Sequence, residues 1–184
     1  MLEYNEIIEA CVKGDRHAQR SLYEIFSKKM FVVCLRYTKS QQEAEDILQD
    51  SFIKVFKNLK GYRGDSRLDY WIKRIVVNTA LNSQRKKLYM YPMVDIEDVK
   101  NDFDLNKTLG AFGLEELLNM IKELPTGCQA VFNMFAIEGF SHKEIAEMLE
   151  VSEGTSKSQF SRARKLLKEK IAKEDKAVRY EKYK

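Results

Sequence analysis

The stretch from Ser141 to Lys170 reads SHKEIAEMLEVSEGTSKSQFSRARKLLKEK. Ser141 and Glu144 have the spacing of a capping box, which predicts the start of a first helix. Ser152 follows the expected turn at Val151 and is a suitable N-cap for a second helix. The sequence therefore predicts two helices joined by a tight turn.

The second of these helices has two distinct faces. Phe160, Ala163 and Leu167 recur at helical spacing and are expected to point inward. The opposite face combines hydroxyl and cationic side chains, namely Ser158, Ser161, Arg162 and Lys165. Such a face after a tight turn is typical of a helix-turn-helix that lies in the major groove of DNA. The alternative is an ordinary helical hairpin whose basic face is solvated.

The amino-acid sequence of this region also resembles a known family. Residues 138–168 are similar to the last region of extracytoplasmic-function sigma factors, members of the sigma-70 family that direct bacterial RNA polymerase to promoters. The resemblance implies contacts to the upstream promoter element from Thr155, Lys157, Ser158, Ser161, Arg162 and Lys165. One departure concerns Ser156, an inward position near the start of the second helix, where the family usually has an aliphatic residue.

The composition restricts the fold and the class of protein. The 184 residues carry a net charge of +4, 33% are charged and only two are proline, which favours long helices in one medium domain or two small ones. The cysteines Cys11, Cys34 and Cys128 lack metal-ligand spacing and are expected to be reduced thiols packed like small apolar residues. His17 and His142 have no motif around them and are expected at the surface.

Two helices are predicted at residues 16–37 and 41–59. The first has a rough inward stripe made of Ala18, Leu22, Ile25, Phe26, Val33 and Cys34. The second starts at a capping box of Ser40 and Glu43 and turns one apolar side inward. Its other face sets the aliphatic Ile53 among polar residues that include Asp46, Gln49 and Asp50. An apolar residue beside carboxylates hints at a protein contact, although a single exposed aliphatic side chain is common.

Residues 44–59, AEDILQDSFIKVFKNL, resemble the sigma segment that binds the clamp helices of the largest polymerase subunit. The resemblance implies that Asp46, Gln49 and Asp50 make this contact, and the position of Ile53 on the same face adds it to the set.

Residues 60–87 are locally basic and contain aromatic residues. Tyr62 and Arg63 lie in an expected loop between two glycines, and a helix is predicted from about Leu68, with Trp71 inward. Aromatic rings among cations suit melted DNA, whereas a core position is the simpler interpretation for the tryptophan. This segment resembles the sigma segment that melts and reads the downstream promoter element. The resemblance implies contacts from Tyr62, Arg63, Lys73, Arg74 and Asn78.

The segment around residues 88–112 loses the helical period and is acidic. We therefore predict an all-α protein of two small helical domains joined by a flexible acidic linker, the C-terminal domain being a helix-turn-helix. The expected boundaries are a region 2-like domain at 1–88, the linker at 89–112, a region 4-like domain at 113–175 and a tail at 176–184.

The resemblance extends over nearly the whole chain and implies a sigma factor that binds core RNA polymerase and promoter DNA. An anti-sigma factor is a further candidate partner. The resemblance implies a bacterial protein, and the scattered cysteines suggest the cytoplasm; the N-terminus lacks a signal-peptide pattern and no apolar run could span a membrane. No catalytic residue, metal, cofactor or small-molecule substrate is expected.

Two alternatives remain from the residues alone. One is a two-domain transcriptional regulator that acts without joining polymerase. The other is a nucleic-acid enzyme, for which Asp46 and Asp50 are one turn apart but lack a third ligand of matching spacing.

Overall fold

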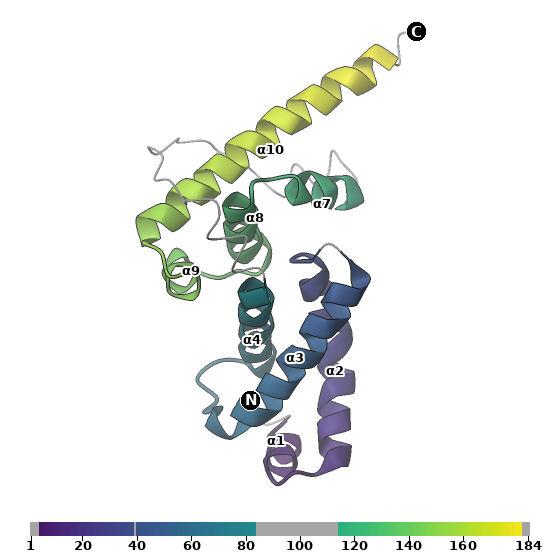
Figure 1. Cartoon of the computed structure of the whole chain (residues 1–184), viewed down its shortest axis with the longest axis vertical. Coiled ribbons are helices and arrows are strands. Elements are labelled where there is room, and N and C mark those ends of the chain that lie inside the picture. Colours follow the sequence, from purple (N-terminus) through teal and green to yellow (C-terminus); the bar gives the residue numbers. More distant parts are fainter. Residues whose placement is uncertain (1–3, 39, 84–113, 182–184) are drawn as a thin grey trace. The chain divides into compact units, whose positions relative to one another are not determined.

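The computed structural model describes residues 4–38, 40–83 and 114–181, and every regular element in these residues is helical. The chain divides into two compact units, unit 1 (Met1–Arg85) and unit 2 (Lys86–Lys184), whose helices are labelled in Figure 1. The prediction of an all-α fold is confirmed. The predicted linker, 89–112, lies outside the described residues.

Unit 1 is built around one long helix. Helix α2 packs against each of the other three α-helices of the unit. The elements in chain order are α1 (Asn5–Val12), α2 (Arg16–Leu35), α3 (Gln41–Asn58), the single 3-10 turn η1 (Leu59–Gly61) and α4 (Leu68–Ser83). A loop of six residues, 62–67, connects η1 to α4.

Helix α2 is capped by Asp15, whose carboxylate accepts hydrogen bonds from the backbone N–H groups of His17 and Ala18 at 2.7 and 3.0 Å. These bonds satisfy two amide groups that the first turn leaves unpaired. The buried stripe of the helix comprises Leu22, Phe26, Met30, Val33 and Cys34. The expected inward position of Ile25 is wrong, because its side chain is 45% exposed. By helical phase Ile25 lies beside the buried stripe, on the side away from Met30 and Cys34, so the core does not cover it.

Unit 2 comprises α7 (Leu114–Lys122), α8 (Thr126–Phe132), one π-helical turn η2 (Asn133–Ile137), α9 (His142–Leu149) and α10 (Glu153–Glu181). Its core cluster consists of Leu117, Met120, Ile121, Leu124, Cys128, Phe132, Ala163 and Leu167. Helix α10 is the longest helix in Figure 1 and continues through residue 175, where the sequence suggested a domain edge.

The predicted helix-turn-helix consists of α9, a short turn and α10. Ser141 and Glu144 form the complete capping box at the start of α9. The helix ends at Glu150, which adopts the left-handed conformation with φ of 57°, and the N–H of Val151 donates back to the carbonyl of Ala146 at 3.0 Å. Left-handed backbone at a helix end reverses the chain and satisfies carbonyls that lack a helical partner. The turn therefore delivers the chain directly into α10.

All three cysteines are buried free thiols, as expected from the sequence. None of the helices that the structure describes is both long and apolar enough to cross a membrane.

Candidate functional site

Helix α3 presents an acidic face with one apolar residue in it. Ser40 caps the helix by accepting a hydrogen bond from the N–H of Glu43 at 3.2 Å, and the inner side is buried from Ala44 to Val55. Asp46, Gln49 and Asp50 are exposed on the outer side. Ile53 lies beside them with 52% of its surface exposed. We name Asp46, Gln49, Asp50 and Ile53 the α3 face; it combines negative charge with an apolar anchor, which suits a basic protein partner.

The loop at 62–67 has an internal framework. The hydroxyl of Tyr62 donates to the carbonyl of Ser66 at 2.6 Å, and its ring centroid lies 5.3 Å from that of Trp71. Gly64 has φ of 77°, a backbone conformation that glycine adopts without steric cost. Arg63 projects into solvent and contacts the neighbouring Asp65 at 3.1 Å. The two predicted loop residues therefore have different surroundings: the side chain of Tyr62 bonds and packs inside the loop, whereas the side chain of Arg63 extends into solvent.

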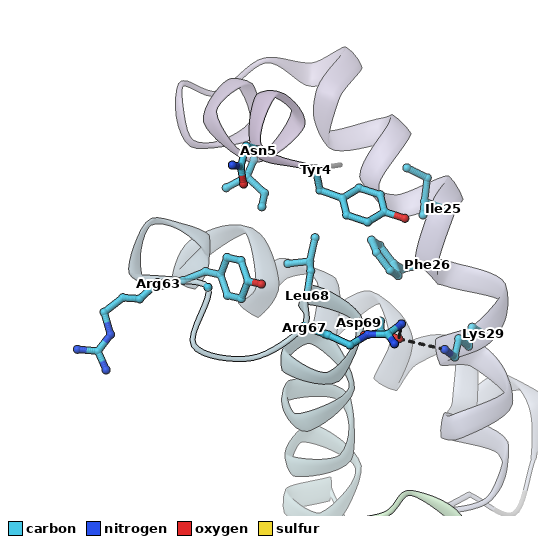
Figure 2. A pocket seen from close by; sticks show the side chains of 12 residues that line it. Tyr4, Asn5, Ile25, Phe26, Lys29, Arg63, Arg67, Leu68 and Asp69 are labelled. Atoms are coloured by element: carbon cyan, nitrogen blue, oxygen red, sulfur yellow. Dashed lines mark hydrogen bonds and ion pairs between the residues drawn. The ribbon is translucent and has the colours of Figure 1, made fainter. Parts of the chain in front are cut away.

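A hollow of about 770 Å³ lies between this loop, the start of α1 and the middle of α2. Its apolar wall includes Ile8, Ile25 and Leu68, and the rings of Tyr4 and Phe26 lie 5.6 Å apart within it. Figure 2 shows these walls and shows that the side chain of Arg63 points away from them. The exposure of Ile25 is explained by this hollow.

A three-residue ionic contact fixes the rim of the hollow. Asp69, in the first turn of α4, accepts from Lys29 of α2 at 3.3 Å and from Arg67 at 3.1 Å (Figure 2). Partial burial raises the pKa of Asp69, but hydrogen bonds from Lys29 and Arg67 outweigh it and hold the pKa below its ordinary value. The carboxylate therefore ties the end of the loop to α2.

Helix α4 carries the remaining residues proposed for the downstream element. Lys73, Arg74 and Asn78 are half-buried, and the ammonium of Lys73 lies 5.6 Å from the ring centroid of Tyr70. The opposite side of the helix contains the fully buried Ile72 and Val76. Trp71, expected in the core, is only half-buried.

The first turns of α10 hold the residues proposed for the upstream element. Ser152 caps the helix by accepting a hydrogen bond from the N–H of Thr155 at 2.9 Å. Arg162 and Lys165 are exposed, as the face pattern predicts, and Lys157 is exposed as well. Ser158 and Ser161, expected on the exposed face, are instead buried, and so is Thr155, for which the resemblance implied a DNA contact. The hydroxyl of Ser158 donates to the carbonyl of Thr155 at 3.0 Å, within the helix itself. Small hydroxyl groups satisfied by their own backbone can be buried at low cost, which helical phase alone does not reveal.

Sequence reasoning missed most of the hollow. Tyr4, Asn5, Phe26, Lys29 and Arg67 line it but come from three separate segments. The only signal in the sequence was the local excess of cations near Arg67. Among the residues that the structure describes, no group of three or more His, Cys, Asp or Glu side chains could hold a metal ion.

Comparisons with known proteins place both units. Residues 22–88 match the family model described as sigma-70 region 2, and residues 114–167 match the model described as sigma-70, region 4. The chain is 29% identical over 177 residues to the ECF RNA polymerase sigma-E factor of Haemophilus influenzae, covering 90% of this chain and 93% of that protein. It is 27% identical over 174 residues to the RNA polymerase sigma-H factor of Pseudomonas aeruginosa, covering 88% and 90%.

A solved structure with a similar fold is the sigma factor RpoE in complex with the anti-sigma factor NepR from Bartonella quintana. It matches with a TM-score of 0.58 and 22% identity over 83% of this chain and 96% of the other. A second is CnrH in complex with the cytosolic domain of CnrY, with a TM-score of 0.56 and 20% identity over 90% and 95%.

The ionic contact at Asp69 predicts a pH dependence. Because its folded pKa is lower than the ordinary value of 3.8, its contribution to stability is present at neutral pH and is lost as the pH falls through 3.8 towards the folded value. Asp69→Asn should therefore lower the free energy of unfolding of unit 1 at pH 7 and make its decline in acid shallower. Urea unfolding followed by the fluorescence of Trp71, the single tryptophan, measures this between pH 3 and 7.

The matched control is Asp65→Asn, because Asp65 is 72% exposed and its ion pair with Arg63 stays within the loop. Exposed pairs of this kind contribute little to stability. If the free energy of unfolding varied with pH in the same way for Asp69→Asn and Asp65→Asn, the ionic contact at Asp69 would not hold the loop.

Proposed function

The chain belongs to the sigma-70 family of RNA polymerase sigma factors, and we propose that it binds core polymerase through unit 1 and directs it to promoters. The observation that carries this conclusion is the presence of region 2 and region 4 in family order, at 22–88 and 114–167. A regulator that acts without polymerase could use a helix-turn-helix such as region 4 to bind DNA, but it has no need of region 2. Run-off transcription with core polymerase on a library of promoters tests the function, and copurification with polymerase separates it from a regulator that acts alone.

The α3 face is our proposed contact to core polymerase. It offers two carboxylates and an exposed isoleucine on a rigid helix whose other side is buried. A basic partner surface with an apolar patch would complement it in charge and shape. Because all four side chains lie on one helix, they could contact a partner together without any rearrangement of the unit.

We assign the loop and α4 to the downstream promoter element. The proposed contacts are Tyr62, Arg63, Lys73, Arg74 and Asn78. Support comes from the exposed guanidinium of Arg63 and from cations along α4 that could hold the phosphates of a single strand. The hollow beside the loop has aromatic walls and a cationic rim, and its size suits an unstacked base.

The start of α10 is assigned to the upstream element. Lys157, Arg162 and Lys165 are exposed and provide charge for phosphate or base contacts. Thr155, Ser158 and Ser161 remain in the proposed set, but direct contact would require them to become exposed.

We further propose that the protein works in the bacterial cytoplasm and performs no covalent chemistry, since polymerase itself forms the RNA. It recognises and opens promoters and takes no small-molecule substrate, cofactor or metal. An anti-sigma factor is a candidate regulator, because the relative from Bartonella quintana was solved in complex with one.

Asp50→Arg should weaken the binding of core polymerase while leaving the fold intact. The substitution places positive charge against a basic partner, and the position is exposed. A pull-down with core polymerase measures the affinity, and circular dichroism checks the fold. Glu9→Arg on α1 is the control, since it makes the same charge change at another exposed site of unit 1. Undiminished affinity in a natively folded Asp50→Arg protein would reject the contact.

Arg162→Ala should weaken recognition of the upstream element by polymerase carrying this subunit. If the guanidinium reads a guanine, the loss is roughly 1–3 kcal/mol and specificity relaxes at one position. If it holds a phosphate, all sequences weaken alike and the salt slope falls by about one. Binding titrations at several salt concentrations distinguish these two cases. Lys168→Ala, at an exposed position on a different side of α10, is the control, and an Arg162→Ala protein indistinguishable from it would exclude both roles.

Tyr62→Ala combined with Arg63→Ala should impair strand opening far more than closed-complex binding. Stacking of an aromatic or guanidinium surface on a base is worth about 1–3 kcal/mol, which offsets part of the cost of unstacking it. Permanganate reactivity of promoter thymines measures opening, and a premelted template should largely restore the double variant. The control is the double variant Tyr23→Ala with Arg20→Ala, which removes the same two residue types from exposed positions on α2 and should not impair opening. Wild-type thymine reactivity in the loop variant on duplex DNA would mean that the loop is only a surface turn.

A further inference from the structure

Ser156 is a polar residue in an apolar position at the start of α10. It has 0% exposure, and its hydroxyl oxygen lies 2.9 Å from Nδ1 of His142, the first residue of α9. A buried hydroxyl without a partner is costly, so a specific bond of this kind identifies a matched pair. His142, which the sequence placed at the surface, is half-buried and makes this specific hydrogen bond.

The imidazole of His142 is held by rings from two other elements. It stacks on Phe135 of η2 with centroids 4.2 Å apart and an angle of 14° between the planes. Phe160 of α10 approaches it edge-on at 5.9 Å and also contacts Phe135 at 4.6 Å. The backbone on its N-terminal side is fixed by the capping box of Ser141. The ring therefore has little freedom to rotate, and its hydrogen bond to Ser156 has a defined direction.

The imidazole is kept in its neutral form. Burial lowers the pKa of His142, the positive charge of Lys157 lowers it further, and Glu153 acts in the opposite direction. Both of these charged residues belong to α10, whereas η2 presents the uncharged Phe135 to the ring. A neutral imidazole has one nitrogen that accepts a hydrogen bond. In the tautomer whose ring proton resides on Nε2, the buried hydroxyl donates to Nδ1.

We propose that His142 and Ser156 are positioning residues, whose hydrogen bond sets the direction in which α10 leaves the turn and so sharpens the reading of the upstream element. The bond joins the first turn of α9 to the first turn of α10, so it connects the two helices across the turn. Lys157 is the next residue after Ser156, and Arg162 lies further along the same rigid helix. An apolar pair would fill the space but would not define an angle, because dispersion contacts have no preferred direction. This inference rests on the proposed function.

The test compares Ser156→Ala, His142→Phe and the double variant in full-length protein bound to core polymerase. His142→Phe retains a ring on Phe135 but removes the nitrogen. The probe is a promoter library randomised at the upstream element, and the readout is the enrichment of preferred over random sequences. We expect each single variant to lower the enrichment about fivefold, the equivalent of one ordinary hydrogen bond, and the double variant to lose no more than either single one. Val131→Ala, which removes fully buried volume from α8, should lower stability with the same enrichment as wild type.

Nitrogen-15 NMR of the imidazole provides a signature that packing alone does not produce. The chain has two histidines, so a His17 variant assigns the His142 signals. The wild type should show a neutral ring with an accepting Nδ1 at pH 7.5, and this signal should change in Ser156→Ala. Unchanged enrichment in the single variants, additive losses in the double variant, or a proton on Nδ1 would each overturn the inference. A wild-type protein that fails to join polymerase or enriches no sequence would overturn the proposed function as well.

Discussion

Burial of one apolar face on each helix is the constraint that determines which side chains this protein leaves for its partners. In α3 the inward packing of Ile47, Leu48 and Val55 turns Asp46 and Asp50 outward. In α10 the burial of Ala163 and Leu167 directs Arg162 to the surface. Fully burying a leucine contributes about 1.5–3 kcal/mol, whereas an exposed ion pair contributes about 0–1 kcal/mol. The exposed charges are therefore positioned by the cores and contribute little to holding the cores together.

The candidate contacts are positioned by two different means. The α3 face and the start of α10 are helix surfaces, so their geometry is set before any partner arrives. The 62–67 loop is instead defined by a few polar bonds, from Tyr62 to Ser66 and from Asp69 to Lys29 and Arg67. Rigid surfaces suit recognition of a partner that keeps its shape. A loop with few bonds suits a ligand such as melted DNA, which must change shape during binding.

The helices, their inward stripes and the helix-turn-helix could be predicted from sequence because they depend on local periodicity and capping. Ser141 with Glu144 is an example, since both partners lie within one turn. Contacts between distant segments could not be predicted this way. Helical periodicity predicted that Ile25 is buried. Whether another segment covers this residue depends on the tertiary structure, and the 62–67 loop leaves Ile25 exposed in the hollow. The burial of Ser158 and the bond between His142 and Ser156 likewise depend on the tertiary arrangement, although the departure at Ser156 marked the position as unusual.

The burial of every cysteine has a consequence for the chemistry that this protein can undergo in an oxidising cell. Oxidants and disulfides react with the thiolate, and burial raises the pKa of Cys34 to about 12 and also raises the pKa of Cys11 and Cys128. All three thiols are thus shielded from solvent and protonated at neutral pH. Oxidation of these cysteines would have to begin with the opening of a helical unit, so its rate would follow local unfolding rather than the concentration of oxidant alone.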